Sequence, residues 1–419
     1  MKLSLGIGGK IILALSSILI VCMLISTFVV TSFLRGIQEE TANKLLVNAA
    51  KREAYKVEGV FNDIYTALNA SRHLVARDVY RGNIAYLEQD VMDILNSNGA
   101  GAFGWLILKD SRFRGEHIDA KYRLPNGDFM ILAVNDDEGD VWKSHIGTAN
   151  ETIANFKNAQ NVLSTGKPSV GRPLWTKIDG KEFFGVGIGQ PIVDERGTTI
   201  GVLGVFIDLL EISNDLQRPD KAVFKGDFKG IYATDSTIAA HGRKEFLGLY
   251  LREVNQSPSM NELKHMIENQ IEGESSYINS LGELSHTAVT TIEVGNKVAV
   301  WTLIVSAPES SIYAAATKAR WILIIANILV VIIIAAGMMI FTKLQITSRL
   351  KSISSYLFRF LKVVNHESQT FPPRLNLNSN DEFGIMAKEI NQNIENIQHG
   401  LEKDQNAIAQ SAQTAKAVE

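Results

Sequence analysis

The sequence predicts an α+β protein in which two apolar helices flank a large folded loop, with a bundle of heptad helices after the second. Three observations lead to this prediction: two long uncharged runs, alternating strand-like and helix-like patterns between them, and heptad spacing after the second run. The 419 residues carry 42 basic and 45 acidic side chains, so the net charge of −3 predicts no nucleic-acid partner. The single cysteine, Cys22, excludes an intrachain disulfide and a thiolate metal cluster.

Both apolar runs are long enough to cross a bilayer, which requires about 20 residues. Residues 11–34 contain no charge, and residues 321–342 contain Asn327 as their one strongly polar member. A cleaved signal peptide, with an apolar core of about 7–15 residues, is the alternative for the first run. Basic residues precede the first run and follow the second, so the positive-inside rule places residues 1–10 in the cytoplasm and residues 35–320 outside. We expect a multi-pass protein of a bacterial inner membrane with this loop in the periplasm.

The loop begins with a predicted long helix over residues 35–79, because Val57, Phe61, Ile64 and Leu68 repeat at helical spacing. Two similar α+β modules then follow, over residues 80–210 and 218–310. The elements expected in the first module are strands at 104–110, 181–193 and 198–208, a turn at 194–197, and a helix that begins near Thr148 with Glu151 in its capping box and ends before Gly166. The elements expected in the second module are two strands within 230–242, a helix at 260–270 and strands at 282–294 and 297–308.

This order of elements resembles the double Cache sensor domain, a PAS-like fold, of bacterial methyl-accepting chemotaxis receptors. The segment GQPIVDERGTTIGVLGVFIDLLEI (189–212) is similar to the end of a membrane-distal Cache module. The segment WTLIVSAPESSI (301–312) is similar to the end of a membrane-proximal one. The resemblance covers residues 35–320 and implies a ligand sensor that takes part in chemotaxis and signal transduction.

After the second run, two heptad series predict two helices joined by a linker that contains Pro372-Pro373. The first series runs from Ile346 to Val364 and the second from Phe383 to Leu401. With the acidic start at residues 380–384, this arrangement resembles a HAMP relay module over residues 343–400, which implies a parallel four-helix bundle in a homodimer. Residues 401–419 would begin a signalling coiled coil. The 419 residues do not include the hairpin through which such receptors contact a chemotaxis kinase and its adaptor, so that contact is expected only through a domain outside them.

A small amino-acid or carboxylate ligand needs a cation for its carboxylate, an anion for any ammonium group and aromatic walls. The residues in the first module that can supply these groups are Tyr122, Trp142, Lys143, Arg172, Trp175, Lys181 and Asp208. By resemblance to amino-acid-binding Cache domains, Trp142, Trp175 and Asp208 match the motif tryptophan, the later tyrosine and the strand-end aspartate. The motif arginine is absent because Asp140 stands there, and Lys143 replaces the following tyrosine, which leaves small carboxylates open beside amino acids.

Each of these residues can also have a purely structural role instead of a ligand contact. Asp208 with Glu211 can cap a helix that starts at Leu209, the two tryptophans can pack at module edges, and the cations can be solvated. Tyr122 can lie at a strand edge. In the second module, His241 is either a turn residue or part of a second site. The glycines of residues 185–189 lie in a strand pattern without a following helix, so they predict close backbone packing rather than a phosphate loop.

No acid–base set or metal-ligand spacing occurs in the sequence, so we expect neither an enzyme nor a cofactor. The expected partners are a small-molecule ligand, the membrane and a second copy of the chain. Two further classes stay open. One is the sensor region of a histidine kinase or nucleotide cyclase whose output domain lies outside these residues, and the other is a truncated decoy receptor.

Overall fold

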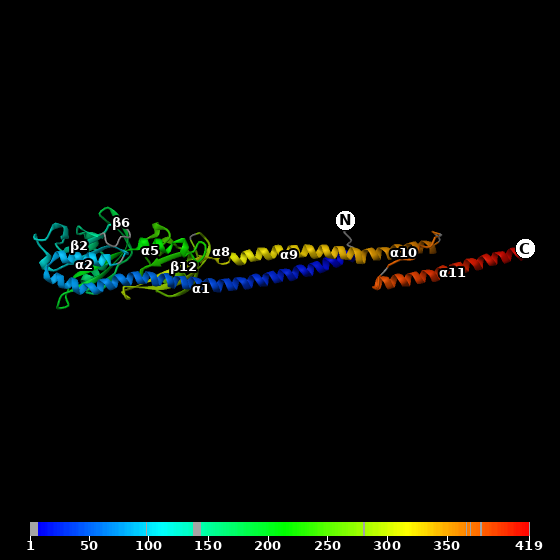
Figure 1. The fold of residues 1–419 in the computed structure, drawn as a ribbon, viewed down its shortest axis with the longest axis horizontal. Coiled ribbons are helices and arrows are strands. Elements are labelled where there is room, and N and C mark those ends of the chain that lie inside the picture. The colour runs from blue at the N-terminus through cyan, green and yellow to red at the C-terminus, as the bar shows by residue number, and fades with distance from the viewer. Residues whose placement is uncertain are drawn as a thin grey trace. The chain divides into compact units, whose positions relative to one another are not determined.

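The computed structural model describes residues 7–97, 99–136, 144–279, 281–365, 367–368, 370–377 and 379–418. The chain forms two compact units. The loop unit is Leu34–Ala316, and the helical unit combines Met1–Phe33 with Thr317–Glu419. Figure 1 shows the elements of both units.

The first helix, α1 (Ile7–Arg81), includes the first apolar run and the predicted helix over residues 35–79. It ends where Gly82 adopts a positive φ of 70° and donates its N–H to the carbonyl of Asp78 at 3.1 Å. Many of its buried side chains in the loop unit recur at steps of three, four or seven residues, as expected for one helix face. They include Leu46, Ala50, Val57, Phe61, Ile64, Leu68, Val75 and Val79.

The first module contains a seven-stranded antiparallel sheet with strand order β3-β2-β1-β7-β6-β4, in which β5 also pairs with β6. Its strands are β1 (Gly101–Leu108), β2 (Phe129–Asn135), β3 (Ser144–Gly147), β4 (Ser169–Val170), β5 (Leu174–Ile178), β6 (Lys181–Val193) and β7 (Thr199–Asp208). Its helices are α2 (Ile84–Asn96), α3 (Glu151–Ala154) and α4 (Lys157–Thr165). The turn between β6 and β7 places Gly197 at a φ of 78°, as the sequence predicted.

Side chains on the two faces of this sheet alternate because successive strand residues point to opposite sides. Leu106 and Leu108 belong to the core that also contains α1 and α2. Phe103, Trp105 and Ile107 belong to a separate core with residues of α3 and α4. The sheet therefore has an α1 face and an opposite face.

Glycines let the opposite face pack tightly. A Cβ added at Gly204 would lie 2.3 Å from Cζ2 of Trp105, and one added at Gly187 would lie 2.8 Å from Nδ2 of Asn158. Real Cβ atoms do not approach that closely, so the indole and α4 lie directly on backbone. This arrangement agrees with the predicted packing role of the strand glycines.

The helix expected over 148–165 is two helices. Asn150 rather than Thr148 caps α3, accepting the N–H of Thr152 at 2.9 Å. The chain then leaves the helical conformation at Phe156 (φ −55°, ψ 134°), and α4 ends at Gly166 in the left-handed conformation. Phe156 turns its ring into the aromatic core, at 6.2 Å from Trp105 between ring centroids, so tertiary packing explains the break.

The second module contains a five-stranded antiparallel sheet with order β10-β11-β12-β8-β9. Its elements are α5 (Leu209–Leu216), β8 (Phe228–Tyr232), β9 (Ile238–Ala240), α6 (Leu251–Val254), α7 (Asn261–Glu268), β10 (Gly273–Ile278), β11 (Leu284–Val294), β12 (Ala299–Pro308) and α8 (Glu309–Ile312). On β12, Trp301 meets Phe61 of α1 edge-on at 5.1 Å, whereas Thr302 donates to the carbonyl of Ile267 in α7. This sheet too has an α1 face and an opposite face.

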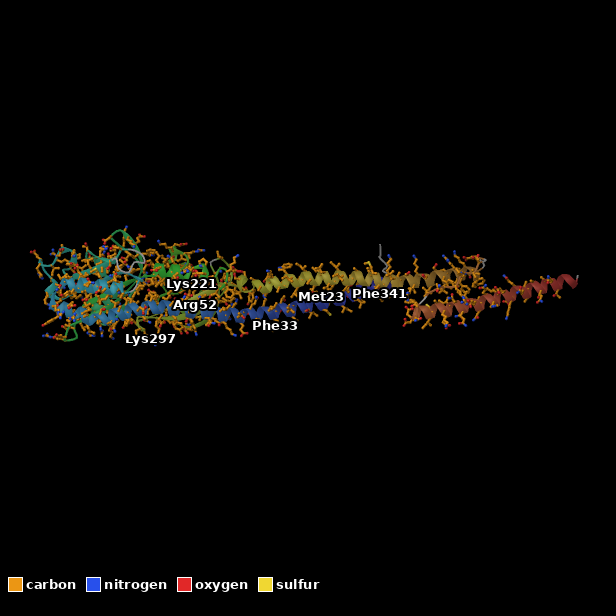
Figure 2. The ribbon with its side chains drawn as sticks, viewed as in Figure 1. Met23, Phe33, Arg52, Lys221, Lys297 and Phe341 are labelled. Carbon is orange, nitrogen blue, oxygen red and sulfur yellow. The ribbon has the colours of Figure 1, made fainter. Side chains whose placement is uncertain are left out.

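The helical unit contains α9 (Ala314–Phe341), which begins in the loop unit, a π-helical segment (Thr342–Thr347), α10 (Ser348–Val364) and α11 (Glu382–Val418). The amide of Asn327 in α9 donates to the hydroxyl of Thr27 in α1 at 2.7 Å. Among described residues, two helices, Gly9–Arg81 and Ala314–Val364, are long and apolar enough to cross a membrane. Met23 and Phe341, labelled in Figure 2, belong to them.

After α9 in the chain, the helices α10 and α11 share a small core of Tyr356, Phe360 and Ile394. Asp381 caps α11 by accepting the N–H groups of Phe383 and Gly384, each at 3.1 Å. Its hydrogen bond with Ser379 is the largest of the causes that lower the pKa of Asp381, and Arg349 adds to it by charge. The capped start of α11 falls inside the acidic segment 380–384 that the sequence marked.

Candidate functional site

The structure places Arg172 and Trp175 at the junction of the two modules. The guanidinium of Arg172 donates to the hydroxyl of Tyr250 at 2.8 Å and lies 4.9 Å from the centre of that ring. The indole N–H of Trp175 donates to the carbonyl of Leu247 at 3.2 Å, and the Lys244 ammonium lies over the same indole. Two of the predicted ligand residues thus hold a loop of the second module.

The other predicted residues lie apart from this junction. Tyr122 is buried and hydrogen-bonds to Glu88 of α2, and burial and that carboxylate raise the pKa of its hydroxyl. Lys181 is exposed at the start of β6, with its ammonium 5.3 Å from the ring of Phe183. Asp208 caps α5, accepting the N–H of Leu210 at 2.7 Å. Trp142 and Lys143, which the sequence also predicted to contact the ligand, lie outside the described residues.

The opposite face of the first sheet is filled by aromatic rings. Phe103 and Phe206 stack with centroids 4.5 Å apart, and Phe183 meets Phe103 edge-on at 5.8 Å. The N–H of Trp105 is buried there without a hydrogen-bond partner in the described structure. This face therefore has a tightly packed aromatic core.

A cavity of about 230 Å³ lies between the modules, beside Arg172. The first module contributes Lys157, Asn158 and Arg172, and the second contributes Asp235 and Trp301. Asn158 is only 2% exposed, and its Nδ2 has no hydrogen-bond partner among the described residues. Two cations, one carboxylate and an unused amide thus surround one space, which suits a small zwitterion or carboxylate. Arg172 is the one member of this set that the sequence singled out, because no local motif links residues of the two modules.

A larger cavity, of about 350 Å³, lies within the second module on the opposite face of its sheet. His241 lines it, with ring contacts to Phe228 at 4.6 Å and Phe246 at 4.9 Å. The Nδ1 atom of His241 accepts the N–H of Arg243 at 2.9 Å. Burial, aided by the Arg243 charge, lowers the pKa of His241 to about 4, so this ring is neutral at pH 7. His241 thus lies in a turn, and its ring faces this cavity; a second ligand site there stays a prediction.

Hydroxyl groups form another part of this cavity wall. Tyr277 donates to the hydroxyl of Ser306 at 3.3 Å, and Asn279 donates to Ser285 at 3.1 Å. These residues come from β10, β11, β12 and the turn after β10. Sequence reasoning missed them; the alternation of Ser275 and Tyr277 on one strand face was the available signal. No group of three or more His, Cys, Asp or Glu side chains that could hold a metal occurs among the described residues.

Comparison with known proteins identifies the fold through solved structures alone. No family model matches the chain, and no curated protein matches it. The periplasmic sensory domain of the Campylobacter jejuni chemoreceptor Tlp1 is similar, with a TM-score of 0.59 at 22% identity over 66% of this chain and 98% of that one.

Two further structures give the same result. The extracellular domain of mmHK1S-Z3, a chain assigned to the histidine kinases, has a TM-score of 0.52 at 14% identity over 67% of this chain and 98% of its own. A structure titled methyl-accepting chemotaxis protein X has a TM-score of 0.51 at 15% identity over 63% and 97%. The chain therefore contains the α+β fold of periplasmic and extracellular sensory domains.

Proposed function

We propose that this chain is the sensor and relay part of a transmembrane chemoreceptor that acts in chemotaxis as a homodimer in a bacterial inner membrane. The observation that carries the proposal is a sensory-domain fold flanked in the chain by two helices that are apolar enough to span a bilayer. In this proposal the loop unit is periplasmic, and α10 and α11 form a cytoplasmic HAMP-type bundle.

The proposed ligand is an amino acid or small carboxylate, bound in the junction cavity beside Arg172. The guanidinium of Arg172 and the ammonium of Lys157 supply positive charge for a carboxylate, and Asp235 supplies negative charge for an ammonium group. Trp175 and Asp208 act here as positioning residues, because Trp175 holds the Leu247 carbonyl of the second module and Asp208 caps α5. A ligand at a junction contacts both modules, so its binding changes the relative stability of their arrangements.

Titration calorimetry on the loop unit, residues 34–316, tests the ligand site against a panel of amino acids and small organic acids. Arg172→Ala should weaken binding by about 5- to 150-fold, equivalent to about 1–3 kcal/mol for a charged hydrogen bond. Lys177→Ala, which removes an exposed cation from neighbouring β5, is the matched control and should bind normally.

Tyr250→Phe separates ligand contact from junction stability, because it removes the hydroxyl that Arg172 contacts and leaves the cavity charges in place. Retained binding in Tyr250→Phe with loss in Arg172→Ala supports direct contact. Equal losses in both variants would mean that Arg172 acts only by holding the junction.

The relay is tested in a hybrid that joins residues 1–400 to the signalling domain of a characterised chemoreceptor. Addition of the identified ligand should change the activity of the associated kinase, because ligand binding shifts a pre-existing equilibrium between two arrangements of the spanning helices. A hybrid that binds ligand but gives constant kinase activity would contradict the proposed relay and leave the proposed ligand binding in place.

The sensor part of a histidine kinase is a second candidate function, favoured by the likeness to the extracellular domain of mmHK1S-Z3. The two candidates share their sensor and differ in the output domain. Sequencing the gene downstream of the codon for Glu419 distinguishes them, since a phosphoacceptor and ATP-binding domain would support a kinase.

A further inference from the structure

We infer that the cavity in the second module is a separate binding site for an uncharged, planar ring compound, lined by Phe228, His241, Phe246, Tyr277 and Ser306. This inference goes beyond the proposed function, because the site and the class of ligand both differ from those at Arg172. It rests on the position of the cavity, its contrast with the first module and the chemistry of its wall.

The cavity lies on a defined face of the second sheet. Along β12, Trp301 packs on α1, whereas Ile304 and Ser306 line the cavity from the other side. Tyr232 of β8 and Tyr277 of β10 line the same space. The sheet thus forms one wall of this cavity, and short segments on its opposite face form the others.

The first module shows that this architecture can be filled by the chain itself. Its opposite face carries the stacked and edge-on rings of Phe103, Phe183 and Phe206. The corresponding face of the second module instead holds a cavity of about 350 Å³ that opens to solvent. The volume falls in the range of small-molecule sites, roughly 300–1,000 Å³.

The wall favours a ring without charge. The ring of His241 contacts the rings of Phe228 and Phe246, and all three line the cavity as flat groups on which another ring can stack. Because Nδ1 of neutral His241 accepts a backbone N–H, its proton is on Nε2, which makes that atom a hydrogen-bond donor.

The two charged side chains of the wall, Arg243 and Asp227, have opposite signs. The Arg243 guanidinium lies 5.5 Å from the Phe246 ring, and the Asp227 carboxylate accepts the N–H of Val223 at 2.7 Å. The hydroxyls of Tyr277 and Ser306 add neutral hydrogen-bonding groups. Because the charges of Arg243 and Asp227 have opposite signs, the wall has no net charge, and an ionised ligand would lose its hydration with little net attraction to offset that loss. A neutral heteroaromatic ring would stack and keep its hydrogen bonds.

The full-length chain in lipid nanodiscs is titrated calorimetrically with nicotinamide, indole and hypoxanthine as neutral rings, and with benzoate and glutamate as anions. At least one neutral ring should bind. Phe246→Ala should weaken that binding at least tenfold, and Phe246→Leu, which keeps an apolar side chain in place, should give an intermediate loss. Leu249→Ala, in the same loop and outside the cavity wall, should bind as the wild type does.

The result is distinguishable from that at the junction, since Lys157→Ala, which removes an exposed cation of the junction cavity, should leave binding of the neutral ring unchanged. Loss in Lys157→Ala but not in Phe246→Ala would assign the ring to the other site and overturn the inference. Failure of all three neutral rings, or tighter binding of benzoate than of every neutral ring, would also overturn it. If Phe246→Ala does not fold, Phe246→Leu with a wild-type melting temperature decides the test.

Discussion

Asp90 on α2 is predicted to destabilise the loop unit at neutral pH. Its Oδ2 atom is buried without a hydrogen-bond partner in the described structure. Burial, with the neighbouring charges of Asp78 and Asp93, raises the pKa of Asp90 from 3.8 to about 6. The folded protein therefore keeps this proton to higher pH than the unfolded chain does, and the free energy of unfolding falls as pH rises from about 4 to 6.

The size of the effect follows from that pKa difference. A pKa that differs by about two between the folded and unfolded states changes the free energy of unfolding by at most about 3 kcal/mol, at about 1.4 kcal/mol per pKa unit. Asp90 is only half-buried, so solvent screens part of this effect. Asp90→Asn keeps the shape and removes the charge, so it should raise the free energy of unfolding by about 1–2 kcal/mol at pH 7.5. At pH 3.5 both proteins are neutral at this position, and the gain should disappear.

Urea unfolding of residues 34–316 at the two pH values measures this difference. Glu116→Gln, which removes an exposed carboxylate from the same module, is the control and should change neither value. An Asp90→Asn variant that is no more stable than the wild type at pH 7.5 would refute the reasoning. So would an equal gain at both pH values, because it could not come from ionisation.

Three other perturbations test different contacts. Gly204→Ala should lower the free energy of unfolding in urea by about 1–3 kcal/mol, because its Cβ would lie 2.3 Å from the indole packed on it. Gly59→Ala in α1 has no atom within 4 Å of its new Cβ and should raise that free energy by about 0.5–1 kcal/mol. Equal effects of the two variants would contradict the close packing at Gly204. Asn327→Leu and Thr27→Val should show a coupling energy of about 0.6–1.7 kcal/mol in a double-mutant cycle of thermal unfolding in nanodiscs, because the two wild-type side chains share one hydrogen bond. Additive losses of stability would contradict this contact. Burial lowers the pKa of His241 from 6.5 to about 4, so the unfolded chain takes up this proton at a higher pH than the folded protein does. The free energy of unfolding should therefore fall by at most about 3 kcal/mol as pH drops from 6.5 towards 4. His241→Phe should weaken this pH dependence, and an unchanged pH profile would contradict the prediction.

The long central strands could be predicted from sequence because both their composition and their turns are local. β6 and β7 are rich in branched and aromatic residues and are joined by a turn that needs a positive φ at Gly197. Strands β3 and β4 are only four and two residues long, too short for a period of two to be recognised. α2 was missed although Leu87, Val91 and Ile94 recur at helical spacing, because it follows α1 closely and reads as part of it.

The candidate site was less predictable, because its chemistry depends on contacts between distant segments. Arg172 was identified as a cation that could bind a carboxylate, but its contact with Tyr250 is 78 residues away in sequence. For Asp208 the sequence left capping and ligand contact open, and the structure shows the capping contact. The neutral state of His241 comes from burial, which no local pattern encodes.

The π-helical segment Thr342–Thr347 sets the angular phase between α9 and α10. Each residue of an α-helix advances the side-chain direction by about 100°, so an inserted residue redirects every side chain that follows by that angle. Heptad positions counted through α9 therefore cannot be carried into α10 without an offset. Deleting one residue from this segment would turn the α10 face that bears Tyr356 and Phe360 by about 100° relative to α9, leaving the composition of both helices unchanged.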